Sequence, residues 1–287
     1  MKKKNWISIL LIVLCLAVLF GYRALDLVRT DRTAPVITME EGHPEFSVQD
    51  TRETLLRGIT AMDNRDGDVT DSLVVESIRL IKADGTAYVS CAAFDKSGNV
   101  ARSTREIRFT DYESPRFRLN RPLLFSQSRS NEILGAISAS DMLDGNISHR
   151  IRATVLEETE SQIGGSSDIL FTVSNSLGDT VELVLPVELY TPGMFEGTLE
   201  LNSYLVYLEK GSRFDANSYL KLLKMRQEEY VLRNGIPEGM ELSVEDSVNT
   251  NVPGIYEVDY LITCNAGDEL VPQIYTARSK LIVVVEG

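Results

Sequence analysis

The sequence predicts an all-β chain in which three β-sandwich domains follow an apolar N-terminal segment. Two motifs support this, because each recurs along the chain at a spacing close to 80 residues. An uncharged run at the N-terminus precedes all copies of both motifs. Apolar residues make up 43% of the chain and charged residues 25%, which is the composition of a folded globular protein.

The first motif reads Ala-x-Asp-x-x-Asp-Gly-Asp/Asn-Val/Ile-Thr/Ser. It begins at Ala61 and again at Ala139, an offset of 78 residues. Self-similarity at a fixed period indicates repeated structural units, so the two copies predict two related domains.

The second motif alternates apolar and other residues and then breaks at a glycine beside Asn or Asp. It occurs at 89–99, at 169–179 and a third time at 254–268. Period-two alternation followed by such a break is typical of a strand that enters a hairpin turn. We therefore expect each repeat to end in a β-hairpin and to form a small sandwich of about seven strands.

Proline-containing joints set the expected domain boundaries at 33–110, 111–190 and 193–287. The third domain diverges, because it lacks the Asp-Gly-Asp stretch. In its place we predict a helical insertion over 217–234, with Asn217 or Ser218 as the N-cap and Asn234-Gly235 as the stop.

The N-terminal segment predicts a membrane anchor. Residues 5–22 carry no charge and would form a helix about 27 Å long, close to the thickness of a bilayer core. The lysines at 1–4 predict a cytoplasmic tail, with 23–32 as a linker and the other domains extracellular, as in a single-pass cell-membrane protein. A cleaved signal peptide and a lipoprotein modified at Cys15 are the alternatives, although the expected cleavage residues are poor for both.

The net charge of −13 is unevenly distributed. Without Lys2, Lys3 and Lys4, 26 basic residues face 42 acidic ones, which leaves about −16 on the remainder. Such a surface repels phosphate backbones, so we expect no nucleic-acid partner. Anionic wall polymers should also be repelled unless a cation bridges them.

The acidic loop is the strongest candidate for a metal site. Asp63, Asp66 and Asp68, with Asp95 as a further candidate, would bring together the hard oxygen ligands that Ca²⁺ prefers. The alternative, which we favour, is that these side chains cap turns and that Gly67 supplies the positive φ. We therefore assign no metal-binding residue.

No catalytic or cofactor-binding residue is predicted either. The two histidines, His43 and His149, lie in different expected domains, which disfavours a nucleophile–histidine pair. Cys91 and Cys264 occupy inward positions of predicted strands in different domains, so we expect buried, inert thiols and no internal disulfide. The sequence thus indicates a protein that is not an enzyme and needs no cofactor.

These motifs resemble a family of tandem bacterial Ig-like surface domains, related to hyalin repeats and also found in some pesticidal crystal toxins. The resemblance rests on 35–37, 63–70 and 93–99 in the first domain, on a looser match in the second, and on 254–260 in the third. It implies three Ig-like β-sandwich domains. It implies little about function, because such modules serve as spacers, adhesins and carbohydrate-binding appendages.

The expected function is a non-catalytic, membrane-anchored extracellular module that has a structural or binding role in the cell envelope. Its partner would be cell-wall polysaccharide or an envelope protein. The alternative is an adhesion or carbohydrate-binding ectodomain that recognises an external ligand. The low aromatic content of 7%, with Trp6 as the only tryptophan, disfavours that alternative.

Overall fold

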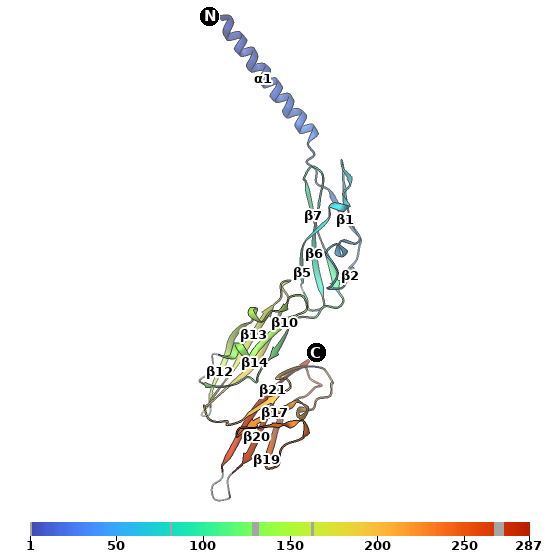
Figure 1. The fold of residues 1–287 in the computed structure, drawn as a ribbon. Coiled ribbons are helices and arrows are strands. Elements are labelled where there is room, and N and C mark those ends of the chain that lie inside the picture. The colour runs from blue at the N-terminus through green and yellow to red at the C-terminus, as the bar shows by residue number, and fades with distance from the viewer. Residues whose placement is uncertain (1, 81, 128–131, 162–163, 267–272) are drawn as a thin grey trace. The chain divides into compact units, whose positions relative to one another are not determined.

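The computed structural model describes residues 2–80, 82–127, 132–161, 164–266 and 273–287 (Figure 1). The chain divides into two compact units, Met1–Tyr112 and Glu113–Gly287. Each unit is described by itself below. The expected boundaries at 33–110, 111–190 and 193–287 stay predictions.

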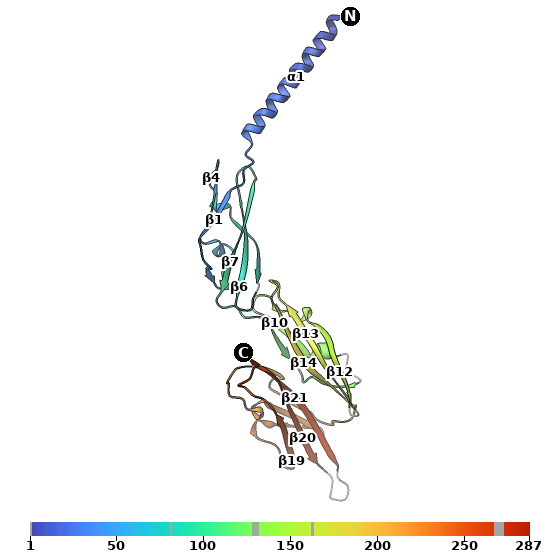
Figure 2. The same cartoon turned by 180° about the vertical axis from the view of Figure 1, so that it is seen from behind.

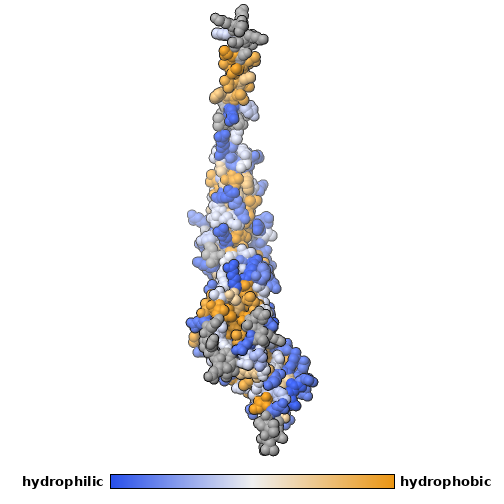
Figure 3. Space-filling model, turned by 90° about the vertical axis from the view of Figure 1, so that its left-hand side faces the viewer, coloured by the Kyte–Doolittle hydropathy of each residue, from blue (hydrophilic) through white to orange (hydrophobic). Residues whose placement is uncertain are grey.

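The first unit begins with α1 (Lys2–Arg29), whose described apolar side chains are exposed (Figure 3). Within the described part of the chain, no helix is long and apolar enough to cross a bilayer. The predictions of a transmembrane helix at 5–22, and of the single-pass membrane location with a cytoplasmic tail at 1–4 that depends on it, are therefore wrong.

Two sheets follow α1 in the first unit, with strand orders β1-β3-β4 and β2-β7-β6-β5. Figure 2 labels β1 and β4 of the first sheet and β6 and β7 of the second. The strands are β1 (Val36–Met39), β2 (Glu45–Phe46), β3 (Ile59–Asp63), β4 (Gly67–Asp68), β5 (Val74–Leu80), β6 (Thr86–Phe94) and β7 (Val100–Phe109). Short 3₁₀ turns occur at η1 (Thr54–Leu56) and η2 (Thr70–Ser72). Inward side chains from both sheets, such as Ala61 of β3 and Cys91 of β6, share one apolar cluster, so the sheets form a sandwich.

The second unit contains the same arrangement twice. One pair of sheets has the orders β11-β10-β8 and β12-β13-β14-β9, and the other has β15-β17-β18 and β16-β21-β20-β19. The first set runs β8 (Arg116–Leu119), β9 (Leu124–Ser126), α2 (Ile133–Ala136), β10 (Ile137–Asp141), β11 (Gly145–Asn146), η4 (Ser148–Arg150), β12 (Arg152–Ser161), β13 (Gly164–Ser174) and β14 (Thr180–Tyr190). The second set runs β15 (Thr198–Leu201), β16 (Leu205–Glu209), η5 (Ala216–Tyr219), β17 (Leu220–Met225), β18 (Glu228–Val231), η6 (Leu232–Asn234), β19 (Met240–Asp246), β20 (Gly254–Asn265) and β21 (Ile274–Glu286).

The register confirms the sandwich prediction. Each copy has a short edge strand that pairs in parallel with its last strand, namely β2 with β7, β9 with β14 and β16 with β21. Long antiparallel hairpins join β6 to β7, β13 to β14 and β20 to β21, as the second motif predicts. The turn predicted at Gly267 and Asp268 lies outside the described residues.

The helical insertion predicted over 217–234 is wrong, because this segment forms the hairpin of β17 and β18. An extra residue in β17, opposite Glu200 and Leu201 of β15, interrupts its register. Leu220 and Leu223 consequently both point inward although they are three residues apart, which imitates a helical period. The turn itself uses Arg226 and Gln227 at positive φ, where the sequence offers no glycine as a signal.

Candidate functional site

Three aspartates meet in the first unit. Asp63 ends β3, Asp95 follows β6, and Asp31 precedes β1, so three separate segments contribute. Their exposed fractions are 4% for Asp31, 6% for Asp63 and 8% for Asp95. One carboxylate oxygen of each lies within 4.8 Å of the other two.

Backbone and amide groups hold these carboxylates in place. Asp63 Oδ1 accepts hydrogen bonds at 2.8 Å from the backbone N–H groups of Asp66 and Arg65, which lower the pKa of Asp63. Asp95 accepts from the Asn99 backbone N–H at 2.7 Å and from its Nδ2 at 2.6 Å.

Asp66 and Asp68 act in turns, apart from the three-aspartate cluster. Asp66 Oδ2 accepts from the Lys96 backbone N–H at 2.8 Å, and Asp68 Oδ1 accepts from the Thr70 backbone N–H at 2.9 Å. Hydrogen bonds from Thr70 lower the pKa of Asp68. Sequence reasoning named Asp63 and Asp95 but missed Asp31, whose signal was its place before the Pro35 joint.

The matching place in the second unit carries a different chemistry. Asp141 ends β10 as Asp63 ends β3, but Asn175 stands where the first unit has Asp95. Asn175 Nδ2 donates to Asp141 Oδ1 at 3.3 Å, and Asn175 Oδ1 accepts from the backbone N–H groups of Leu177 and Asp179 at 3.0 Å. An amide–carboxylate pair therefore replaces a carboxylate–carboxylate contact.

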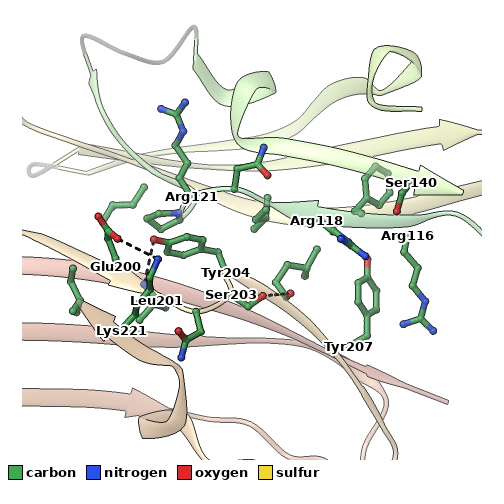
Figure 4. Close-up of a pocket in the computed structure, with 18 of the residues that line it drawn as sticks. Arg116, Arg118, Arg121, Ser140, Glu200, Leu201, Ser203, Tyr204, Tyr207 and Lys221 are labelled. Atoms are coloured by element: carbon green, nitrogen blue, oxygen red, sulfur yellow. Dashed lines mark hydrogen bonds and ion pairs between the residues drawn. The ribbon is translucent and has the colours of Figure 1, made fainter. Parts of the chain in front are cut away.

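A groove of about 1230 Å³ crosses the second unit between β8 and the strands β15, β16 and β17 (Figure 4). Its basic lining residues are Arg116, Arg118, Arg121, Lys221 and Arg278. Its acidic lining residues are Glu113, Asp141 and Glu200. Basic side chains thus outnumber acidic ones here, five to three, within a chain whose net charge is −13.

Strand alternation places the arginines. In β8, Phe117 and Leu119 are buried and Arg116 and Arg118 are exposed, so both arginines project from the same face. Arg116 forms an ion pair with Glu286 at 3.4 Å, and Arg121 forms one with Glu132 at 2.7 Å; both carboxylates are also partly exposed. Among the described residues, no carboxylate pairs with Arg118.

Aromatic rings line the same groove. Tyr190 and Phe195 pack edge to face with ring centroids 5.1 Å apart. The guanidinium of Arg116 lies 4.9 Å from the ring centroid of Tyr207. Burial raises the pKa of Tyr204 and of Tyr207, so both phenols stay neutral at physiological pH.

The two walls of the groove share a continuous core. Leu205 of β16 and Ile282 of β21 belong to the same buried cluster as Phe117 and Leu119 of β8. A charged network reinforces the contact: Arg278 pairs with Glu188 at 2.7 Å, and the buried Lys280 amine donates to Glu188 and Glu257. The groove is therefore set in one packed body.

The groove was not predicted from the sequence. Its signal was the stretch 116–121, Arg-Phe-Arg-Leu-Asn-Arg, which concentrates three basic residues in an acidic chain. The partner residues of the groove, such as Tyr204 and Lys221, come from about 80 to 100 residues further along, and only the tertiary structure brings them together.

The two thiols lie in the environment that the sequence predicts. Cys91 and Cys264 are buried, as predicted, and burial raises the pKa of the Cys91 thiol, which keeps it protonated. His43 lies on the surface 3.4 Å from Glu106, and His149 is exposed.

Comparisons with known proteins give weak likenesses. No protein-family model and no curated protein matches the chain. Among solved structures, the CBM51-2 and INT domains of Clostridium perfringens ZmpB, solved with GlcNAc, are 16% identical with a TM-score of 0.22, over 49% of this chain and 29% of that one. Protocadherin gamma B2 cadherin domains 1–5 are 8% identical with a TM-score of 0.19, over 88% of this chain and 53% of that one.

Mouse cadherin-23 domains EC22–24 are 11% identical with a TM-score of 0.20, over 88% of this chain and 99% of that one. The chain thus spans less than a third of the ZmpB structure and about half of the protocadherin structure. TM-scores near 0.2 are too low for these likenesses to support a function or a partner. The expected link to hyalin repeats stays a prediction.

Proposed function

We propose that the chain is a non-catalytic binding module whose second unit binds an acidic glycan in the groove between β8 and β15–β17. The observation that carries the proposal is the row Arg116, Arg118 and Arg121 beside aromatic rings, on a chain that is otherwise strongly acidic. The best-fitting class of ligand is a polysaccharide that carries carboxylate or phosphate groups.

The two kinds of side chain would divide the recognition. Guanidinium groups donate in a fixed fork that matches carboxylates and phosphates. Aromatic rings such as Tyr190 and Tyr204 offer rigid apolar faces for the C–H surfaces of sugars. Asn120 and Asn202, which also line the groove, add amide donors and acceptors for hydroxyl groups.

The charge distribution refines the expectation that anionic wall polymers are repelled. That expectation treats the charge as uniform, whereas the groove collects five basic side chains. A surface that repels polyanions elsewhere would direct them to this basic region. Cell-wall polysaccharide therefore remains the favoured partner, and an envelope protein becomes an outcome of the test below.

The carboxylates of the groove favour binding over hydrolysis. A glycosidase needs one carboxyl group with a raised pKa as its general acid. Glu200 is paired with Lys224 at 2.9 Å and Lys221 at 3.7 Å, and these lysines lower its pKa. Asp141 accepts from the backbone N–H groups of Leu143 and Asp144, which occupies it structurally.

The test is a calorimetric titration of the full chain with oligogalacturonate, with poly(glycerol phosphate) and with a neutral malto-oligosaccharide. Removing one charge-assisted contact costs about 1.5 kcal/mol, so Arg118→Ala should weaken binding of the acidic glycan roughly tenfold. Arg152→Ala is the matched control, because it removes one exposed arginine of the same unit from β12, outside the groove.

Binding of either acidic polymer that weakens with salt and with Arg118→Ala, but not with Arg152→Ala, supports the proposal. The polymer that binds more tightly tells carboxylate from phosphate recognition. Equal loss in both variants, equal affinity for the neutral sugar, or no binding of any polymer would overturn it. A protein captured from envelope extract by the wild type and by Arg118→Ala alike would assign binding to another surface.

A further inference from the structure

The aspartate cluster of the first unit has two orphaned oxygen atoms. Asp31 Oδ2 and Asp63 Oδ2 are buried and accept no hydrogen bond. Both side chains are more than nine-tenths buried, with exposed fractions of 4% and 6%. Buried carboxylate oxygens are normally paired, so these two atoms need an explanation beyond turn capping.

The local charges also do not balance. Asp31, Asp63 and Asp95 carry three negative charges when ionised. Among the described residues, the cation that pairs with this cluster is the Arg65 guanidinium, whose Nε lies 3.8 Å from Asp31 Oδ2. Arg65 is itself 48% exposed, so solvent weakens its compensation. One divalent cation would neutralise the remaining two charges.

We infer that Asp31, Asp63 and Asp95 bind a single divalent cation, with Ca²⁺ as the best fit. Three oxygens within 4.8 Å of one another leave a point no more than about 2.8 Å from each, close to the 2.3–2.6 Å of Ca²⁺–oxygen bonds. Mg²⁺ demands bonds of about 2.0–2.1 Å and a near-ideal octahedron, which three ligands from separate segments meet less well.

The existing hydrogen bonds are compatible with this ion. Asp63 Oδ1 accepts from the backbone N–H groups of Arg65 and Asp66, and Asp31 Oδ1 accepts from that of Thr33. In both aspartates, Oδ2 is thus left to bind the ion. Both Asp95 oxygens accept from Asn99, but a carboxylate oxygen retains a second lone pair for a metal.

Two other places in the chain bring carboxylates close to further polar side chains, and in both the carboxylates have a partner that the cluster of the first unit lacks. In the second unit, Asn175 replaces the third aspartate and donates to Asp141 at 3.3 Å, which satisfies the site without an ion. Glu188, Glu257 and Asp259 also come together, but Lys280 and Arg278 neutralise them. The inference therefore applies to the first unit alone.

The full chain, stripped with EDTA, should be titrated with CaCl₂ and with MgCl₂ by calorimetry. Asp95→Asn recreates the pairing of the second unit, so this variant should fold while losing the site. Asp68→Asn is the matched control, because Asp68 is an exposed turn residue of the same loop outside the cluster. We expect one equivalent of Ca²⁺ for wild type and for Asp68→Asn, and none for Asp95→Asn.

Thermal unfolding separates loss of the site from loss of the fold. Ca²⁺ at a hundredfold excess over its Kd should raise the wild-type Tm of the first unit by roughly 10 °C. In EDTA, Asp95→Asn should melt at or above the wild-type Tm, because one buried charge is gone, and Ca²⁺ should not change it. No calcium heat and no Tm shift in the wild type would overturn the inference, as would an Asp95→Asn variant that responds to Ca²⁺ like the wild type.

Discussion

Replacing Lys280 with methionine should selectively destabilise the second unit. The lysine side chain is 1% exposed, and its amine donates to Glu188 and Glu257. Breaking a buried ion pair costs about 3–5 kcal/mol when the partner is left unpaired. In Lys280→Met, Glu188 still pairs with Arg278 at 2.7 Å, and Glu257, which is 38% exposed, can be hydrated by solvent. We therefore expect a smaller loss of stability, about 2–3 kcal/mol.

The assay is pulsed hydrogen exchange with mass spectrometry across a urea series, which reads each unit from its own peptides. With a urea slope of about 2 kcal/mol/M, the midpoint of β20 peptides should fall by about 1–1.5 M, while β6 peptides stay unchanged. Lys96→Met is the control, because its pair with Asp66 spans 3.6 Å and its side chain is 82% exposed. An unchanged β20 midpoint, or an equal fall for β6, would refute the reasoning.

Three further predictions concern stability. Tyr260→Phe removes a buried hydroxyl that donates to a backbone carbonyl at 2.8 Å, and should cost the second unit about 1–2 kcal/mol by urea denaturation; no change would contradict this. Gly85→Ala should cost the first unit at least about 2 kcal/mol in the same assay, because φ is +85° and a Cβ would lie 2.1 Å from the Phe109 carbonyl oxygen; a neutral effect would refute the steric argument. Burial raises the pKa of Glu188, but hydrogen bonds and charges from Lys280 and a neighbouring arginine outweigh it, so the net pKa is lowered. The ion pairs of Glu188 therefore stabilise the fold above the unfolded pKa of about 4.3, and this stabilisation is lost as the pH falls below that value. The urea midpoint of the second unit should consequently drop between pH 5 and pH 3, and by more in the wild type than in Lys280→Met. Equal drops in the two proteins would contradict this assignment.

The strand framework follows from the sequence because burial on one side of each sheet enforces period-two alternation. That pattern identifies the long hairpins, including β20 and β21, from residues alone. The hairpin of β17 and β18 escaped prediction for two local reasons. The extra residue in β17 places Leu220 and Leu223 on the same side, and the turn at Arg226 and Gln227 carries no glycine or asparagine.

The candidate sites were less predictable because they depend on contacts distant in sequence. Asp63 lies in the first repeated motif and Asp95 in the second, but their third partner, Asp31, lies outside both. The basic groove combines β8 with strands much further along the chain, so a net charge of −13 conceals it. The net charge argues against a nucleic-acid partner for the surface as a whole. Which ligand a particular region can bind depends on the charged side chains gathered in that region.

The most direct test of the proposed function maps where an acidic glycan contacts the chain. Hydrogen exchange should be measured on the full chain with and without saturating oligogalacturonate. The proposal predicts slower exchange in peptides that cover 116–121 and 198–207, and no change in peptides that cover β12. Protection confined to β12, or spread evenly over both units, would contradict the assignment of the groove as the binding site.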